Sequence, residues 1–396
     1  MKVSVVTGFT PTEENVRGIS GLIYALIKYR PEDVDLKIYS YNLNRISEEE
    51  IKKLEKELHA HIILVRKPYW MRIFDNTLMG HFNKFCMRLP MVCYEISKVL
   101  VNQLRKDHPD FVWVYPYFYY RLAKRMPEQK FVVTGCDCEA LIRVRSFETK
   151  KCLLDSKALR HNYLMLKKGL RFENEWNLPN VKVHFVGMED MRFYERTYGY
   201  HNAAFLLHPH YRLTDNTIRF DGPKIKIIVA GSYDVYMQDD VDEMLPNLIR
   251  YKDLLSQYYE FTFLGRNWEP VQEKLEAEGV ECTFKSWVED YAKELVNHDI
   301  QLTPISFGTG TKGKVLSALA NGLLVVGSKY AFDNICVRNG DSCICYKKAS
   351  DIAFLLMDLA KDRERCIEIA GKGRSQVRTY HCPKRISRRF FNIFNA

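Results

Sequence analysis

Short apolar runs alternate with amphipathic helical patterns along the first half of the chain. The apolar runs have the length and the β-branched content of buried strands, whereas the stretches between them repeat apolar residues at helical spacing. This alternation predicts a doubly wound α/β domain with a parallel sheet. Strands are expected over 2–7, 35–39, 61–65, 111–115, 131–134, 181–186 and 204–207, and helices over 22–29, 48–59 and 95–104.

A polar stretch near 212–223, closed by Asp221-Gly222-Pro223, interrupts the alternation. A strongly β-prone run over 225–230 follows, and the pattern then restarts, so the second half has a sheet of its own. Its expected elements are helices from 240, 270 and 289 and strands over 261–264 and 281–284. Two such domains facing each other would form a cleft at the carboxyl ends of their strands. We expect domains over 1–215 and 225–375, a linker over 216–224, and a helix over 376–396 that packs back on the first domain.

The segment 299–328 combines two apolar strands with an intervening helix. The first strand ends at Pro304, the helix-forming run ends at Ala320, and Gly322 fits a left-handed helix C-cap. The order strand, turn, helix and strand predicts one βαβ unit of a parallel sheet.

The turn of this unit has the residue types of an anion site. Gly308, Gly310 and Gly313 let a ligand approach the backbone, and the free N–H groups that open a helix attract negative charge. Lys312 and Lys314 add positive charge at the same place. The sequence therefore predicts that a phosphate binds here.

The loop matches the motifs of two families of phosphate-binding proteins only in part. As a Walker A loop, Gly308 to Lys314 fits GxxxxGK, but Val315 follows where a hydroxyl should hold magnesium. As a dinucleotide fingerprint, the three glycines fit GxGxxG, but the next strand ends in Gly327-Ser328 and lacks the acidic residue that would bind a ribose. A P-loop NTPase and a dinucleotide-dependent oxidoreductase are therefore the weaker alternatives.

The same run resembles the donor-binding segment of GT-B glycosyltransferases similar to glycosyltransferase family 4. Many of these enzymes carry G-T-[KR]-x-K-V-L-E-A-M-A-x-G-x-P-V-V, and this chain has GTKGKVLSALANGLLVV from Gly310 to Val326. The family glutamate that binds the donor ribose is replaced by Ser317, and the earlier glutamate of the E-x7-E pattern by Thr309, as is common in the GTGTK-type subgroup. A serine hydroxyl still hydrogen-bonds a ribose, although less strongly than a carboxylate.

The resemblance extends over most of the second half. The segment 227–233 is similar to the strand and glycine turn that open the GT-B donor domain, and 263–265 to the next strand and turn. The arginine and lysine that many members carry after the first donor-domain strand are replaced by Ser232 and Met237. Donor-binding residues implied by the resemblance are Gly231, Ser232, Gly265, Trp287, Val288, Gly308, Thr309, Gly310, Thr311, Lys314 and Ser317, with Lys312 acting on the departing phosphate.

In the first half the resemblance is limited to two places. Arg17, Gly18 and Ile19 lie where such enzymes place a glycine loop that faces the acceptor, although these residues also fit an ordinary strand–helix turn. Asp137, just after a strand, occupies a position where relatives often have an acidic residue or a histidine near the sugar. A carboxylate there could act as a base, and helix capping is the alternative role.

Composition and charge are compatible with this picture. The net charge of +10 favours anionic partners, but no basic block is long enough to suggest a nucleic-acid arm. Basic residues cluster instead with aromatics over 66–74 and 384–391, where they could contact an anionic membrane surface or could simply be the solvated side of packed aromatics. The eleven cysteines lack paired CxxC spacing, which predicts reduced thiols rather than zinc sites. The chain start is that of a strand and not of a signal peptide, and no apolar run is long enough to span a bilayer.

The resemblance implies a GT-B fold, with two Rossmann-like domains facing a central cleft, and a glycosyltransferase that uses a UDP- or GDP-sugar. It also implies retention of anomeric configuration, no cofactor and no metal, with a saccharide or lipid-linked saccharide as acceptor. A cytoplasmic enzyme of surface polysaccharide assembly, peripheral at the inner face of a membrane, is the expected setting. A glycosyltransferase-like protein that binds nucleotide without catalysis is the alternative. The oligomeric state is left open.

Overall fold

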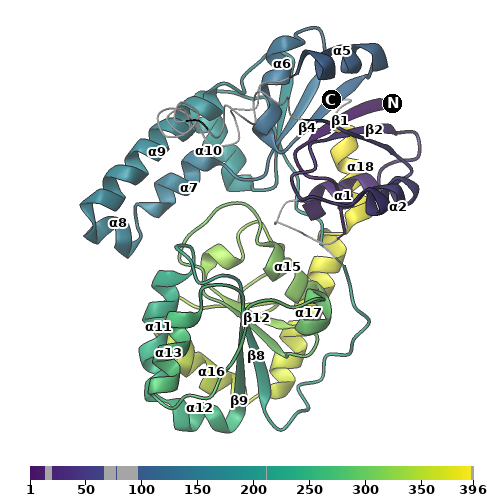
Figure 1. The fold of residues 1–396 in the computed structure, drawn as a ribbon. Helices are drawn as coiled ribbons and strands as arrows, with labels where there is room; N and C mark the ends of the chain where they lie inside the picture. The colour runs from purple at the N-terminus through teal and green to yellow at the C-terminus, as the bar shows by residue number, and fades with distance from the viewer. Residues whose placement is uncertain (14–19, 67–76, 78–96, 211, 394–396) are drawn as a thin grey trace. The chain divides into compact units, whose positions relative to one another are not determined.

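The computed structural model describes residues 1–13, 20–66, 77, 97–210 and 212–393. The chain divides into two compact units (Figure 1). Unit 1 comprises Met1–Phe147, Asp155–Pro209 and Pro383–Ala396, and unit 2 comprises Glu148–Leu154 and His210–Cys382. Over the described residues, no helix combines the length and the apolar character that crossing a membrane requires.

Unit 1 is built on a parallel sheet with the order β3-β2-β1-β4-β5-β6-β7. Its strands are apolar and buried, as expected for a sheet that is covered by helices on both faces. The strands are β1 (Lys2–Thr7), β2 (Asp35–Ser40), β3 (His61–Leu64), β4 (Phe111–Tyr115), β5 (Phe131–Gly135), β6 (Val181–Phe185) and β7 (Ala203–Phe205).

The helices of unit 1 begin where local capping allows. Ser47 caps α2 through a capping box with Glu50. The helix expected over 95–104 instead runs over Lys98–Asp107, because the Ser97 hydroxyl accepts a hydrogen bond from the N–H of Val99 and sets the start. The helices are α1 (Ser20–Lys28), α2 (Glu48–Leu58), α5 (Lys98–Asp107), α6 (Arg121–Arg125), α7 (Glu139–Ser146), α9 (Ser156–Asn174), α10 (Met188–Tyr198) and α18 (Pro383–Asn392).

The C-terminal helix α18 is part of the core of unit 1. Its Ser387 hydroxyl donates to the carbonyl of Leu26 in α1 at 2.6 Å, and the ring of Phe390 lies 4.5 Å from that of Trp113. Phe390 and Phe391 are both buried. The basic-aromatic tail therefore packs its aromatic residues inside the protein, and the interpretation that they face a membrane is wrong. The other basic-aromatic segment, 66–74, lies outside the described residues except for Arg66.

Unit 2 contains a second parallel sheet with the order β10-β9-β8-β11-β12-β13. Its strands are β8 (Ile225–Ala230), β9 (Tyr259–Leu264), β10 (Thr283–Lys285), β11 (Ile300–Thr303), β12 (Leu324–Gly327) and β13 (Ile344–Cys345). Its helices are α8 (Lys150–Leu154), α11 (Gln238–Arg250), α12 (Lys252–Tyr258), α13 (Glu269–Ala277), α14 (Tyr291–Leu295), α15 (Gly313–Ala320), α16 (Ile352–Ala360) and α17 (Arg363–Tyr380).

The chain passes between the units at points that differ from the sequence-based boundaries. It enters unit 2 at Pro209–His210 rather than near 216, and leaves it at Cys382–Pro383 rather than near 376. The later exit follows from α17, whose Arg378 donates a hydrogen bond to the carbonyl of Ala320 in α15 at 2.9 Å and so keeps the helix on unit 2. The short segment Glu148–Leu154 also belongs to unit 2, where the N–H of Lys150 donates to the Asp239 carboxylate at 2.8 Å.

Candidate functional site

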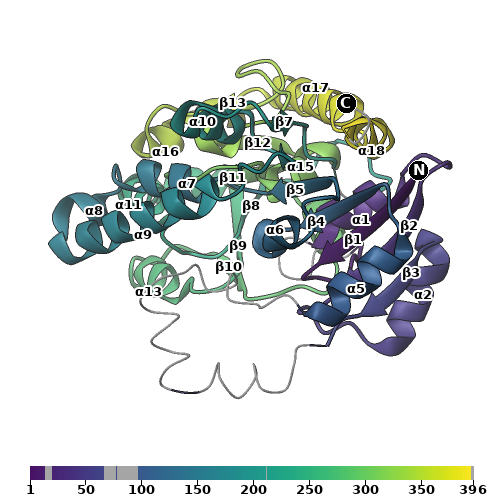
Figure 2. The ribbon, with the colours of Figure 1, turned by 90° about the horizontal axis from the view of Figure 1, so that it is seen from above.

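The order of strands in unit 2 creates one place where loops on the same edge diverge. From β8 the chain moves outward through β9 and β10, and then returns to place β11 on the other side of β8 (Figure 2). Open α/β sheets bind ligands at such a switch point, just beyond the carboxyl ends of the two strands. The loop after β8 begins with Gly231, and the loop after β11 leads into α15, so the predicted phosphate loop lies at the switch point.

The start of α15 has no capping hydrogen bond from the side chain of its N-cap residue. Lys312 is the N-cap residue, and its carbonyl accepts hydrogen bonds from the N–H groups of Val315 and Leu316 at 2.9 and 3.1 Å. Its side chain makes no capping hydrogen bond. The first N–H groups of a helix have no acceptor within the helix, and they carry its positive dipole end. This end of α15 is therefore a suitable binding site for an anion.

Lys314, in the first turn of α15, reaches across to the loop after β8. Its amine donates to the sulfur of Met237 at 3.2 Å, and a Cβ atom added at Gly231 would lie 2.4 Å from the Lys314 nitrogen. A side chain at position 231 would therefore displace the lysine. Although the residue keeps some exposed surface, burial of its amine lowers the pKa of Lys314 to about 8, opposed by the nearby Asp234 and reinforced by Lys312.

Lys314 places a cation beside the loop after β8, whose residues 231–237 include no lysine or arginine. The sulfur of Met237 is a weak acceptor for the Lys314 amine. The sequence pattern did not reveal this contact, because the two residues are far apart in the chain.

The loop between β11 and α15 holds a second lysine and an unpartnered hydroxyl. The Lys312 amine donates to the carbonyl of Thr309 at 2.5 Å and lies 3.2 Å from the Cβ position of Gly308. Thr309 is buried, and its hydroxyl oxygen has no hydrogen-bond partner. Because a buried hydroxyl without a partner is costly, this group marks a place where a polar ligand atom would be stabilising.

Replacing Thr309 with valine separates a ligand role from a packing role. Valine has nearly the same shape, so the free energy of unfolding should stay the same or rise slightly once the unpartnered hydroxyl is gone. If the hydroxyl binds a ligand, the affinity for a nucleotide sugar should fall roughly threefold to tenfold. Calorimetric titration and urea unfolding of the same variant measure both quantities. A less stable variant with unchanged affinity would assign Thr309 to packing.

The backbone at the ends of β8 and β9 is held by close contact. A Cβ atom at Gly265 would lie 2.0 Å from the carbonyl oxygen of Gly231, so only glycine fits there. The indole N–H of Trp268 donates to the same carbonyl at 2.8 Å, and the N–H of Gly265 donates to the carbonyl of Lys285 at 2.8 Å. These contacts fix the surface on which the phosphate loop and Lys314 lie. Trp268 was not among the residues predicted from the sequence.

The remaining predicted donor residues occupy different surroundings. Ser317 is buried in α15, one helical turn after Lys314. The carbonyl of Gly310 accepts a hydrogen bond from the Asn334 side chain at 3.0 Å, which anchors the loop. Trp287, in the segment after β10, has a side chain that is 73% exposed, whereas Val288 packs against the core of unit 2. Ser232 and Thr311 are both half-buried.

Of the two features predicted for unit 1, only Asp137 lies within the described residues. Asp137 lies half-buried in the turn between β5 and α7, but it is not the cap of α7, because Cys138 occupies the N-cap position. The N–H of Cys138 donates to the buried carboxylate of Asp190 at 2.8 Å. Arg17, Gly18 and Ile19 lie outside the described residues.

The geometry disfavours the two other phosphate-binding families. Val315, at the position of the Walker A hydroxyl, is fully buried in the core. Ser328, directly after β12, donates its hydroxyl to the carbonyl of Ile305 at 2.5 Å, so it replaces the acidic ribose contact with a structural one. Among the described residues, no group of three or more His, Cys, Asp or Glu side chains could hold a metal ion. The described members of the CxC pairs are free cysteines.

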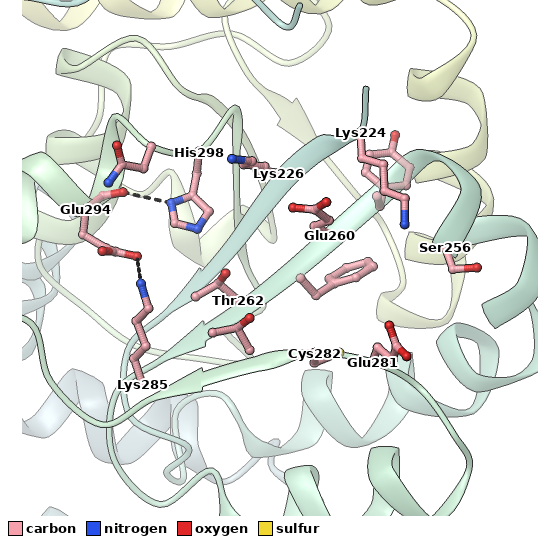
Figure 3. A pocket seen from close by; sticks show the side chains of 14 residues that line it. Lys224, Lys226, Ser256, Glu260, Thr262, Glu281, Cys282, Lys285, Glu294 and His298 are labelled. Carbon is pink, nitrogen blue, oxygen red and sulfur yellow. Dashed lines mark hydrogen bonds and ion pairs between the residues drawn. The ribbon is translucent and has the colours of Figure 1, made fainter. Parts of the chain in front are cut away.

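A separate cavity of about 460 Å³ opens at the amino-terminal half of β8, β9 and β10 (Figure 3). Three lysines and three glutamates line it, and Lys285 and Glu294 form an ion pair at 2.6 Å. Lys226, near the start of β8, belongs to this cavity, whereas Gly231 follows the other end of the strand and lies beside Lys314. None of the cavity residues is among those predicted for donor binding.

Comparison with solved structures shows to which known fold the two parallel sheets belong. The UDP-glucose complex of HepE from Anabaena superimposes with a TM-score of 0.66 at 10% sequence identity, covering 100% of this chain and 99% of that one. The chain has the GT-B fold. A glycosyltransferase from Rickettsia africae gives a TM-score of 0.63 at 13% identity, covering 100% and 98% of the two chains. WaaG, a GT-B glycosyltransferase involved in lipopolysaccharide biosynthesis, gives 0.61 at 14% identity, covering 97% and 98%.

Sequence comparison places a family domain on the same part of the molecule as the phosphate loop. Residues 224–362 match the family described as Glycosyl transferases group 1. This range lies within unit 2 and contains β8, β11 and α15. None of the curated protein sequences matches the chain. The prediction of a GT-B fold is confirmed.

Proposed function

We propose that this protein is a glycosyltransferase that moves a sugar from a UDP- or GDP-sugar to a saccharide or a lipid-linked saccharide. The observation that carries the proposal is the uncapped start of α15, with Lys314 buried beside it and Lys312 above it, at the switch point of the sheet. The Glycosyl transferases group 1 match over 224–362 and the likeness to a UDP-glucose complex support the same conclusion.

The chemistry follows from where charge develops. When the bond between the sugar and the diphosphate breaks, negative charge grows on the phosphate oxygens. Amides at a helix start and ammonium groups that are already in position stabilise that charge in the transition state. In this proposal Lys312 and Lys314 perform that task without a metal, and the sugar is transferred with retention of configuration. Asp137 is proposed to orient or deprotonate the acceptor hydroxyl.

Donor recognition is assigned to the groups around the phosphate loop. We assign the ribose to the hydroxyl of Ser317 and the diphosphate to the backbone of 308–311. The base is assigned to the backbone near Trp287 and Val288. A cytoplasmic enzyme that extends surface polysaccharide, with its acceptor at the inner face of a membrane, is the proposed setting.

A catalytically inactive nucleotide-binding protein is the second candidate. It is favoured by two departures from the family pattern: Ser317 replaces the glutamate, and Ser232 and Met237 replace the arginine and lysine. Hydroxyl groups bind sugar and ribose oxygens less strongly than carboxylates do. Affinity for a nucleotide without sugar transfer would be the result of those changes.

Calorimetric titration with UDP, GDP and CMP tests the phosphate site. We expect one of the nucleotides to bind and Lys312→Ala to lower its affinity roughly tenfold, because a charge-assisted hydrogen bond to phosphate is lost. The fold should be unchanged, since Lys312 is only half-buried and its amine donates to a carbonyl of the same loop, that of Thr309. An affinity in Lys312→Ala equal to that of the unchanged protein would remove this lysine from the site.

Incubation with a panel of nucleotide sugars separates the two candidates. A transferase should release nucleotide slowly even without an acceptor, because water replaces the acceptor at a low rate. The release should fall in Lys312→Ala together with affinity. Tight binding of a nucleotide sugar with no release, in the presence and absence of lipid-linked saccharides, would identify the inactive binding protein.

A further inference from the structure

Helix α9 of unit 1 carries a strongly basic surface. Between Ser156 and Asn174 it has five lysines and arginines and a single carboxylate, Glu173, whose side chain is buried. The charge that faces solvent is therefore positive along the whole helix. The basic residues are Lys157, Arg160, Lys167, Lys168 and Arg171.

The opposite side of α9 is fixed against α7, with which it lies side by side (Figures 1 and 2). Asn162 accepts a hydrogen bond from the Ser146 hydroxyl at 2.7 Å and donates to the carbonyl of Arg143 at 3.0 Å. A Cβ atom at Gly169 would lie 3.3 Å from the backbone nitrogen of Ala140. These contacts bury one side of the helix and determine which residues face outward.

Apolar residues accompany the charges on the outer side. Leu159, Tyr163 and Leu164 keep 45%, 49% and 48% of their surface exposed, although the burial of such side chains is usually favourable. The Lys167 ammonium lies 4.6 Å from the centre of the Tyr163 ring. The exposed apolar residues and the cations are thus interleaved on one helix of 19 residues, which is about 28 Å long.

We propose that α9 docks on an anionic lipid bilayer, lying in the plane of the headgroups. Lysine and arginine stems extend along apolar surface while their charges reach lipid phosphates, and leucine and tyrosine enter the boundary between headgroups and acyl chains. A nucleic acid would use the positive charge but would leave the two leucines without an apolar environment. The proposal is independent of sugar transfer, because the phosphate loop lies in unit 2.

Sedimentation of the full chain with vesicles tests the proposal. We expect binding to vesicles of phosphatidylcholine with phosphatidylglycerol and little binding to phosphatidylcholine alone. The double variant Arg160→Glu with Lys167→Glu should lower the partition coefficient by roughly 30-fold or more. Each basic side chain near an anionic surface contributes about a fivefold factor, and the two new carboxylates add repulsion. The matched control is Lys52→Glu with Lys56→Glu on the exposed side of α2, which changes net charge equally. It should bind nearly as the unchanged protein does.

A second variant distinguishes insertion from charge attraction alone. Leu159→Ser with Leu164→Ser keeps every charge, and should lower vesicle binding about tenfold, including at high salt where surface charges are screened. Nucleotide affinity should be unchanged in all variants and serves as the control for folding. Equal loss of binding in the α2 and α9 charge variants, unchanged binding in the leucine variant, or a preference for single-stranded nucleic acid over anionic vesicles would each overturn the proposal.

Discussion

Replacing Lys314 with methionine should lower the affinity for a nucleoside diphosphate by roughly 100-fold, because a buried charge-assisted hydrogen bond to phosphate is lost. The fold should tolerate the change. The Lys314 amine makes a weak contact with the sulfur of Met237, and methionine is an unbranched side chain that fills most of the same space without a buried charge. Calorimetric titration measures the loss, and Lys274→Met, at an exposed site on α13, is the matched control. Nucleotide binding that survives in Lys314→Met would show that this amine does not contact phosphate.

The same lysine predicts how binding depends on pH. Burial lowers the pKa of Lys314 to about 8 from its ordinary value of 10.5, and a bound diphosphate should raise it again. The complex then binds more protons than the free protein, so affinity should fall as pH rises above about 8. The pH dependence of folding stability has the opposite sign to that of nucleotide affinity. Between about 8 and 10.5 the unfolded chain binds the extra proton, and this group makes stability increase with pH.

Replacing Phe390 with alanine should destabilise unit 1 by about 3–5 kcal/mol, the usual cost of truncating a buried aromatic residue. Phe390 is fully buried against Trp113, and α18 is tied to α1 through Ser387. Hydrogen exchange should therefore accelerate in β4 and α1 and stay unchanged in unit 2. The control Arg388→Ala with Arg389→Ala, exposed on the same helix, should change stability by no more than about 0.5 kcal/mol. Equal exchange in Phe390→Ala and the unchanged protein would show that α18 is not part of the core.

Much of the fold could be predicted because local patterns and tertiary structure agree. Apart from β13, which was not predicted, the strands of both sheets begin and end within two residues of the apolar runs, since a strand buried on both faces must be apolar throughout. The left-handed glycine that ends α15 was also correctly identified, as Gly322 has a φ of 85°. These features depend on neighbouring residues, which a single sequence displays directly.

Long-range contacts were the part that the sequence could not provide. The contact of Lys314 with Met237 and Gly231 joins residues about 80 positions apart, and nothing in the local pattern indicates it. The basic-aromatic tail is a second case in which the local pattern was not sufficient. Its alternation of basic and aromatic residues fits both a membrane-facing helix and a packed one, and only the contact with Trp113 distinguishes them. The exposed leucines of α9 are visible only once its contact with α7 is known.

A crystal structure of the protein with UDP or GDP tests the central claim most directly. The account predicts that the diphosphate lies at the start of α15, with its oxygens in hydrogen-bond distance of the backbone amides of that turn and of the Lys314 amine. A nucleotide bound with its phosphates away from α15, for example in the cavity beside Lys226 and Lys285, would contradict it.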